Sequence, residues 1–362
     1  MQAARTCTSL SATARAASTA AAGRAALAGH ARFCLAGIQA KHMPGSSLGS
    51  RCVSSVSSTL PPGAADSLFG EAVQLPSIDA QSLVSHADAA QLEEDGAIVL
   101  RDAFPNVWVQ TLRAAAERNL SNPGPLCDEH ARAQGSGGRF HDDQFLWRRH
   151  PEFEAYVRRS GAAQIAARAM GSRSANILYD QLFVKEPGTS APTPWHNDTS
   201  YWPLEGKQIC SIWLALDMVP AGRGLCYVRG SHKWQLRHAI TNFSGGDHSA
   251  KNVYGGAASL EPVPDIDAGA ARGEYELLRW DMEPGDILIF YSATMHGGPG
   301  NSSSKGQRRR GYATRWCGDD VVFVERAGTM NDGWKAAGFD SGLKPGQSIT
   351  CDLHPNILAP SS

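Results

Sequence analysis

The sequence lacks both a net charge and long apolar runs. Its 362 residues carry 34 basic and 35 acidic side chains, which gives a formal net charge of −1 at pH 7. A chain without an excess of positive charge has little with which to hold a polyanion, so we expect no nucleic-acid partner. It contains no stretch of about 18 consecutive apolar residues, which a membrane-spanning helix would require. With 42% hydrophobic residues, the sequence instead suits a folded domain with a sizeable core.

The cysteines lack the spacing of a disulfide framework or of a thiolate zinc site. The chain has 8 cysteines but no Cys-x-x-Cys pair. Three lie near the N-terminus, and the others follow at wide intervals: Cys127, Cys210, Cys226, Cys317 and Cys351. Because the number of these cysteines is odd and their spacing is wide, we expect reduced and mostly buried thiols.

Residues 1–65 lack acidic side chains altogether. Asp66 is the first acidic residue, and the basic residues before it are Arg5, Arg15, Arg24, Arg32, Lys41 and Arg51. Ala, Ser, Thr and Gly make up most of the rest. This composition is typical of an organelle transit peptide, so we expect a leader that directs the chain to a mitochondrion or a plastid. An N-terminal tail without a targeting role is the alternative.

From about residue 76 the chain has the composition of a globular domain. The spacing of apolar residues predicts helices over 82–94, 108–120 and 151–170, a strand over 97–100 and a polar loop over 123–144. Residues 242–272 are rich in Gly and Ala, and we expect a long surface insertion or a lid there.

Short runs of β-type composition follow Gly171, separated by Pro and Gly turns. They are 176–184, 209–216, 225–228, 286–291 and 312–316. Few helical patterns lie between them, which favours an antiparallel barrel or sandwich over a doubly wound parallel sheet.

The residues around position 196 carry the first candidate chemistry. In an extended chain, residues two positions apart point the same way, so His196 and Asp198 can offer a nitrogen and a carboxylate oxygen to one metal ion. A second His-x-Asp pair, His141 and Asp143, lies in the predicted polar loop, so the pattern alone is weak evidence.

A third candidate ligand strengthens the first pair. His296 comes shortly after the predicted strand 286–291. Two histidines and one carboxylate in a β-barrel form the facial triad that is typical of non-haem Fe(II) oxygenases, because it leaves metal positions open.

Three consecutive arginines begin the last β-type run. Alternation along a strand places Arg309 with Gly311 and Ala313 on one face, and Arg310 on the other. An arginine inside a barrel can bind the distal carboxylate of 2-oxoglutarate through two hydrogen bonds. An exposed basic loop is the alternative.

With these residues in place, the chain resembles the phytanoyl-CoA dioxygenase family, whose members are Fe(II)- and 2-oxoglutarate-dependent oxygenases with a double-stranded β-helix core. The resemblance covers about residues 76–330. It rests on an ordered series of matching segments: 94–101, 195–198, 213–217, 228–232, 296–298 with Asn301, and 309–312. It implies a mainly β fold with flanking α-helices around a jelly-roll, cupin-like core. The expected organisation is the leader 1–65, a dioxygenase domain over 76–330 and a C-terminal extension over 331–362.

The resemblance also implies roles for single residues. His196, Asp198 and His296 would hold iron, and Arg309 would bind the C5 carboxylate of 2-oxoglutarate. Trp213 and Gln181 match family positions that line the cosubstrate, and Tyr179 shares the strand face of Gln181.

This chain departs from the family pattern in three places. Gly298 stands where some members have serine, and no lysine lies between Gly135 and Arg148, where some members use one. Two extra residues before the arginines make Arg308 a rival to Arg309. Farther along, Arg315 is expected either to meet an acidic group or to pair with the aspartates after it on the surface.

The sequence therefore predicts an oxidoreductase, an iron- and 2-oxoglutarate-dependent dioxygenase. It would use O2 to hydroxylate a small organic or acyl substrate and release succinate and CO2. A catalytically silent β-barrel binding protein, or a barrel enzyme with another divalent metal, is the alternative.

Overall fold

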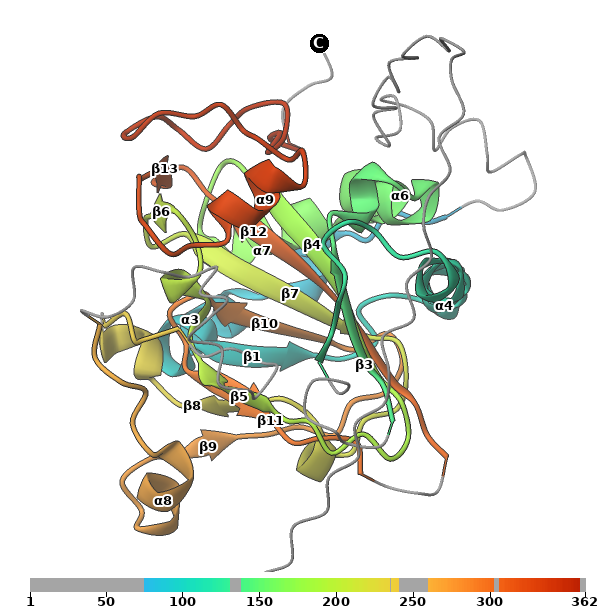
Figure 1. Ribbon diagram of the computed structural model, residues 1–362, viewed down its shortest axis with the longest axis vertical. Coiled ribbons are helices and arrows are strands. Elements are labelled where there is room, and N and C mark those ends of the chain that lie inside the picture. Colours follow the sequence, from blue (N-terminus) through green and yellow to red (C-terminus); the bar gives the residue numbers. More distant parts are fainter. Residues whose placement is uncertain (1–74, 131–137, 235, 241–259, 303–305, 359–362) are drawn as a thin grey trace, which may run out of the picture. The chain divides into compact units, whose positions relative to one another are not determined.

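A computed structural model describes residues 75–130, 138–234, 236–240, 260–302 and 306–358. The predicted leader 1–65 and most of the predicted insertion 242–272 lie outside these residues. Within them, two antiparallel sheets form the centre of the domain and helices pack against the larger sheet (Figure 1).

The larger sheet has the strand order β1-β10-β7-β12-β4-β3-β2, and every neighbouring pair is antiparallel. Its strands are β1 (Ala97–Leu100), β2 (Asp128–Glu129), β3 (Phe140–Gln144), β4 (Asn176–Lys185), β7 (Ile209–Ala215), β10 (Ile287–Tyr291) and β12 (Arg309–Cys317). Several strands that are neighbours in space, such as β1 and β10 or β12 and β4, are distant in the chain. This arrangement confirms the antiparallel jelly-roll core that the sequence predicted.

The smaller sheet has the order β5-β11-β8-β9. Its strands are β5 (Thr193–His196), β8 (Cys226–Val228), β9 (Leu277–Leu278) and β11 (His296–Gly298), and a separate pair joins β6 (Leu204–Glu205) to β13 (Val322–Phe323). The smaller sheet carries both histidines of the predicted triad.

The helices that precede β4 in the chain cover the outer face of the larger sheet. The described helices are α2 (Ala80–Leu83), α3 (His86–Asp95), α4 (Asn106–Ser121), α6 (Pro151–Arg159), α7 (Ala162–Met170), α8 (Ile266–Ala271) and α9 (Asn331–Ala336). Short 3-10 turns lie at η1 (Leu146–Arg148), η2 (Asp198–Ser200), η3 (Ala221–Arg223) and η4 (Ser231–Trp234). Trp108 of α4 and Tyr156 of α6 join one buried apolar cluster with Tyr312, which points outward from β12. The inward-facing Trp213 and Ala313 belong to a different cluster with Tyr227 of the smaller sheet. The alternation of β7 and β12 thus separates a helix-covered face from a face that looks into the barrel.

The predicted helix 151–170 is wrong in one respect, because it is two helices. α6 starts with Pro151 at its first position and has acidic residues in its first turn, both of which favour a helix start. The break falls at Gly161, whose φ of 94° lies in the left-handed region that suits glycine. A Cβ at this position would lie 2.3 Å from the carbonyl oxygen of Ile78, so the chain also needs the space.

The predicted loop 123–144 is wrong at Asp128–Glu129, which forms β2, and at its end, where the paired strand lies. Phe140–Gln144 forms β3, which pairs with β4 from Phe140↔Lys185 to Gln144↔Gln181. Its polar sequence gave no strand signal, because Asp142 and Gln144 face the cavity and bind polar partners there, Gln181 and the indole N–H of Trp334. The predicted helix 82–94 also differs, since α2 ends at Leu83 and α3 begins at His86 after a Ser85 capping box.

Candidate active site

The structure brings His196, Asp198 and His296 together. His196 ends β5, Asp198 begins the η2 turn, and His296 begins β11 directly opposite His196 in the β5–β11 pair. The Asp198 Oδ1 atom lies 3.7 Å from His196 Nε2 and 3.9 Å from His296 Nε2. One ligand atom from each residue lies within 4.8 Å of the other two, and all three side chains are buried.

Hydrogen bonds fix the orientation of these three side chains. The Nδ1 atom of His196 donates to Pro194 O at 2.8 Å, and the Nδ1 atom of His296 donates to Thr294 O at 2.9 Å. A carbonyl oxygen only accepts, so each ring carries its proton on Nδ1 and turns an unprotonated Nε2 toward Asp198. Ser211 Oγ donates to Asp198 Oδ2 at 3.1 Å, which orients the carboxylate.

The electrostatics agree with metal binding. Burial lowers the pKa of His196 to about 3, with a further contribution from His296, and burial also lowers the pKa of His296. Both imidazoles are therefore neutral at pH 7, as metal ligands must be. Two imidazoles and one carboxylate suit non-haem iron, whereas a structural zinc site closes with four ligands.

A second group of metal-ligating residue types is separate from the triad, although one member lines the cavity that contains the triad. It comprises Cys127, Glu129 and His141. Burial and nearby carboxylates raise the pKa of the Cys127 thiol to about 12, and Arg139 donates two hydrogen bonds to Glu129 from Nε and Nη2. The thiol therefore stays protonated and the carboxylate is already paired, so this group is a hydrogen-bonded structural cluster.

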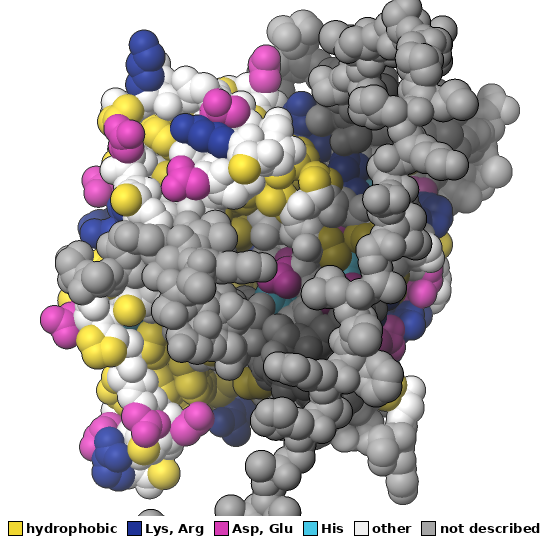
Figure 2. All heavy atoms as spheres, in the orientation of Figure 1, with side chains coloured by type: hydrophobic (Ala, Val, Ile, Leu, Met, Phe, Trp, Pro, Cys, Tyr) yellow, Lys and Arg dark blue, Asp and Glu magenta, His cyan; other side chains and the backbone are white. Residues whose placement is uncertain are grey.

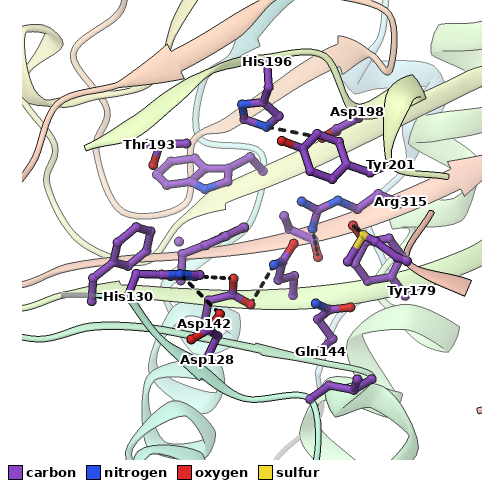
Figure 3. A pocket seen from close by; sticks show the side chains of 18 of the residues that line it. Asp128, His130, Asp142, Gln144, Tyr179, Thr193, His196, Asp198, Tyr201 and Arg315 are labelled. Atoms are coloured by element: carbon purple, nitrogen blue, oxygen red, sulfur yellow. Dashed lines mark hydrogen bonds and ion pairs between the residues drawn. The ribbon is translucent and has the colours of Figure 1, made fainter. Parts of the chain in front are cut away.

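The triad lies in a cavity of about 350 Å³ between the two sheets (Figure 3). In Figure 2, histidine and acidic side chains are visible deep in the centre of the view, with hydrophobic side chains beside them. Alternate residues of β4 and β12 line the cavity: Tyr179, Gln181, Phe183 and Lys185 on β4, and Arg309, Gly311, Ala313 and Arg315 on β12. Neighbours in this register face each other in pairs, from Arg309↔Lys185 to Arg315↔Tyr179.

The structure separates Arg309 from its rival Arg308. Arg309 is buried, lines the cavity and donates to the carbonyl oxygens of Arg223 and Pro299. Burial lowers its pKa to about 10, so it remains a cation at pH 7. Arg308 lies outside the cavity and forms ion pairs with Glu117 and Glu186.

The other predicted cosubstrate residues line the same cavity. Trp213 packs on Gly311, where an added Cβ would lie 2.1 Å from the indole ring. Gln181 Nε2 donates to Asp142 Oδ1 at 2.7 Å, and the Tyr179 hydroxyl accepts a hydrogen bond from Trp202 Nε1 at 3.2 Å.

Lys185 is a cavity residue that the sequence reasoning missed. Its Nζ atom donates to Ala191 O at 3.0 Å and to Thr193 Oγ1 at 3.1 Å. Burial and the adjacent Arg309 lower its pKa well below the ordinary value. The signal was present in the sequence, because Lys185 follows Gln181 at the even spacing that keeps both on one strand face.

Two further parts of the wall were not predicted. Asp142 on β3 accepts hydrogen bonds inside the cavity, and Trp334 of α9 lines it from the segment predicted as a C-terminal extension. The C-terminal segment therefore contributes directly to the pocket.

Comparison with known proteins identifies the family. The sequence profile of the phytanoyl-CoA dioxygenase family matches residues 92–311, more than half of the chain. The chain belongs to the phytanoyl-CoA dioxygenase family. It is therefore an iron- and 2-oxoglutarate-dependent dioxygenase, an oxidoreductase whose predicted cofactors are confirmed by this membership.

A curated relative agrees with this placement. A "Probable phytanoyl-CoA dioxygenase" from Caenorhabditis elegans is 26% identical over 276 residues, which cover 69% of this chain and 81% of the relative.

Solved structures share the fold of this dioxygenase. The non-haem α-ketoglutarate-dependent carbocyclase SnoK from nogalamycin biosynthesis matches with a TM-score of 0.58 at 22% identity, over 77% of this chain and 98% of that one. EctD from S. alaskensis, solved with 2-oxoglutarate and 5-hydroxyectoine, matches with a TM-score of 0.51 at 21% identity, over 67% and 80%. No helix among the described residues is long and apolar enough to cross a membrane.

Proposed function

We propose that this dioxygenase hydroxylates a small organic or acyl substrate, with O2 and 2-oxoglutarate consumed and succinate and CO2 released. The observation that carries the proposal is the joint placement of the triad and a buried arginine. His196, Asp198 and His296 turn their ligand atoms toward one position, and Arg309 lies in the same cavity.

The triad residues are proposed to hold the iron. Bound iron with 2-oxoglutarate supplies the activation of O2 from which one oxygen atom enters the substrate and the other enters succinate. The contribution of the chain is to fix the two Nε2 atoms and Asp198 Oδ1 through the carbonyls and the Ser211 hydroxyl that hold them.

Arg309 is proposed to bind the C5 carboxylate of 2-oxoglutarate. Its guanidinium is cationic and buried, and no carboxylate among the described residues forms an ion pair with it. Lys185 lies opposite Arg309 in the register and lines the same end of the cavity, where it donates to Ala191 O, Thr193 Oγ1 and Pro299 O. Trp213, Gln181 and Tyr179 are proposed as walls that orient the cosubstrate and exclude water.

An anaerobic titration of the full chain tests the proposal. Fe(II) is added first, then 2-oxoglutarate, while the visible charge-transfer band of the chelate is recorded. We expect a saturable band in the native protein and in Glu129→Gln, a matched change of a carboxylate in the other group of ligating residue types, at a residue that does not line the cavity. Asp198→Ala should lose the band.

The remaining outcomes separate the alternatives. A folded native protein that binds no iron points to a silent β-barrel. A protein that binds a divalent metal but shows no band with 2-oxoglutarate points to an enzyme with other metal chemistry.

A further inference from the structure

Arg315 is a second buried arginine in the cavity, at the end that holds the triad. It is 5% exposed and lies on the inward face of β12 (Figure 3). In the sheet it pairs with Ser211 of β7, whose hydroxyl donates to Asp198. Arg315 is therefore a neighbour of the residues proposed to hold iron, and it does not pair with surface aspartates as one reading of the sequence suggested.

No carboxylate among the described residues of the cavity neutralises Arg315. The described acidic residues that line the cavity are Asp128, Asp142 and Asp198. Asp142 accepts hydrogen bonds from His130 and Gln181, and Asp198 faces the two histidines and Ser211. Asp128 pairs with His130.

The guanidinium has donors to spare. Its Nε atom is buried without a hydrogen-bond partner, and one Nη donates to Ala313 O at a long 3.4 Å. A buried cation with unused donors is costly unless an anion joins it. Arg315 therefore has the properties of an anion-binding group whose partner comes from outside the chain.

Arg315 and Arg309 serve different ends of the cavity. They lie on the same strand face six positions apart, so their Cα atoms are separated by about 20 Å. Between them the inward residues are Gly311, whose lack of a side chain makes space for the Trp213 ring, and Ala313, whose short side chain leaves room for a bound molecule. With Arg309 assigned to the cosubstrate, Arg315 remains for a different anion.

The surroundings of Arg315 are aromatic. Its guanidinium carbon lies 4.9 Å from the ring centroid of Tyr179 and 5.7 Å from that of Phe183. Tyr201, Met330 and Trp334 line the same cavity. A planar guanidinium held against rings keeps its N–H groups available at its edge, where they fit a carboxylate in a bidentate way.

We propose that Arg315 binds a carboxylate of the substrate and sets an apolar body against the aromatic walls beside the triad. The substrate class is thus a small carboxylic acid with a hydrophobic or aromatic body. This inference rests on the proposed function, because it assumes that Arg309 holds 2-oxoglutarate.

The test compares carboxylates with their neutral amides. The probes are butyrate and butyramide, octanoate and octanamide, and 3-phenylpropanoate and 3-phenylpropanamide. Each is titrated anaerobically into full-length protein saturated with Fe(II) and 2-oxoglutarate, and binding is measured calorimetrically and from the shift of the visible band. Native protein is compared with Arg315→Met, Arg315→Lys and the control Arg310→Gln, which removes a guanidinium from the outer face of the same strand.

In native protein and in Arg310→Gln, at least one acid should bind about tenfold or more tightly than its amide. Arg315→Met should bring acid and amide to equal affinity while keeping the 2-oxoglutarate band, and Arg315→Lys should restore part of the preference. Because the lysine variant keeps a cation at this position, it preserves the test if the methionine variant does not fold.

Two results would overturn the inference. If no acid is preferred by the native protein although its band is intact, Arg315 does not select a carboxylate. If Arg315→Met and Arg315→Lys remain folded but both lose the 2-oxoglutarate band, Arg315 binds the cosubstrate instead. If the native protein shows no 2-oxoglutarate band at all, the proposed function itself is contradicted. This result differs from the two above, in which the native protein keeps its band.

Discussion

At the triad, a few hydrogen bonds decide how three side chains are presented. Backbone carbonyls fix both histidine rings, whereas the carboxylate depends on one hydroxyl, that of Ser211. Groups that orient metal ligands from behind influence metal affinity although they never touch the metal. The orientation of Asp198 is thus the part of the site that a single side-chain change can perturb.

We expect Ser211→Ala to weaken Fe(II) binding by about tenfold or more, because Asp198 loses its only described hydroxyl donor. Competition with a chromophoric chelator measures the affinity. Ser174→Ala, which removes an exposed hydroxyl bonded to Asp319, is the matched control and should bind iron normally. Equal affinity in the two variants would show that Asp198 is oriented by other contacts.

A second expectation concerns pH and the buried His130–Asp142 pair. Burial lowers the pKa of His130, but the hydrogen bond and the charge of Asp142 outweigh it, so the net shift is upward. The protonated pair therefore stabilises the fold fully below pH 6.5, the ordinary histidine pKa, and this contribution is lost as pH rises through the higher folded-state pKa.

Urea unfolding of native protein and Asp142→Asn between pH 5.5 and about 9 measures this effect. The native protein should have the larger free energy of unfolding at low pH, and the difference between the two proteins should decrease as the pH rises. Glutamine does not titrate. The difference in the free energy of unfolding between His130→Gln and the double variant His130→Gln/Asp142→Asn should therefore not change with pH. If the difference between the native protein and Asp142→Asn increases with pH, the upward shift of the His130 pKa is contradicted.

Single residues also show which parts of the site could be predicted from the sequence. The triad was predictable because its ligands form a spaced pattern in strand-like context. Arg315 and Lys185 are lone charged residues in strands, and nothing in the sequence says which acidic groups lie nearby. Their lack of carboxylate partners among the described residues emerges only when the sheets are assembled.

At the level of elements, apolar strands were predictable and polar ones were not. β7 and β10 are rich in branched and aromatic residues, as buried strands are. β3 reads Phe-His-Asp-Asp-Gln, and its place in the sheet depends on backbone pairing with β4 and on polar partners such as Gln181. A strand whose inward side chains are mostly polar therefore escapes a search for hydrophobic alternation.

The break between α6 and α7 gives a prediction at this scale. Gly161→Ala forces a side chain into a left-handed conformation and against Ile78 O, so we expect a loss of about 2 kcal/mol or more in the free energy of unfolding. Gly171→Ala is the control, since Gly171 has a φ of 63° but nothing within 4 Å of the added Cβ. It should cost about 1 kcal/mol. Equal losses in urea unfolding would mean that the Ile78 contact relaxes freely.

At the scale of the whole molecule, we propose that residues 1–65 direct the chain to a mitochondrion or a plastid. Six basic residues without an acidic one support this proposal. A fluorescent protein fused after residue 65 should enter one of these organelles, and import should fail when Arg5, Arg15 and Arg24 are changed to Glu. If the unaltered fusion shows diffuse fluorescence, residues 1–65 are a tail without a targeting role.

The strand order of the larger sheet has a consequence for synthesis on the ribosome. β1 has β10 as its described partner, with Ala97 opposite Phe290, and Trp334 closes part of the cavity wall. A nascent chain that has not yet been translated past these residues has neither the pairing nor the pocket. A ligand that binds only the complete site cannot stabilise the chain before the last of these residues is made. During translation, β1 therefore remains without its partner strand until β10 has been synthesised.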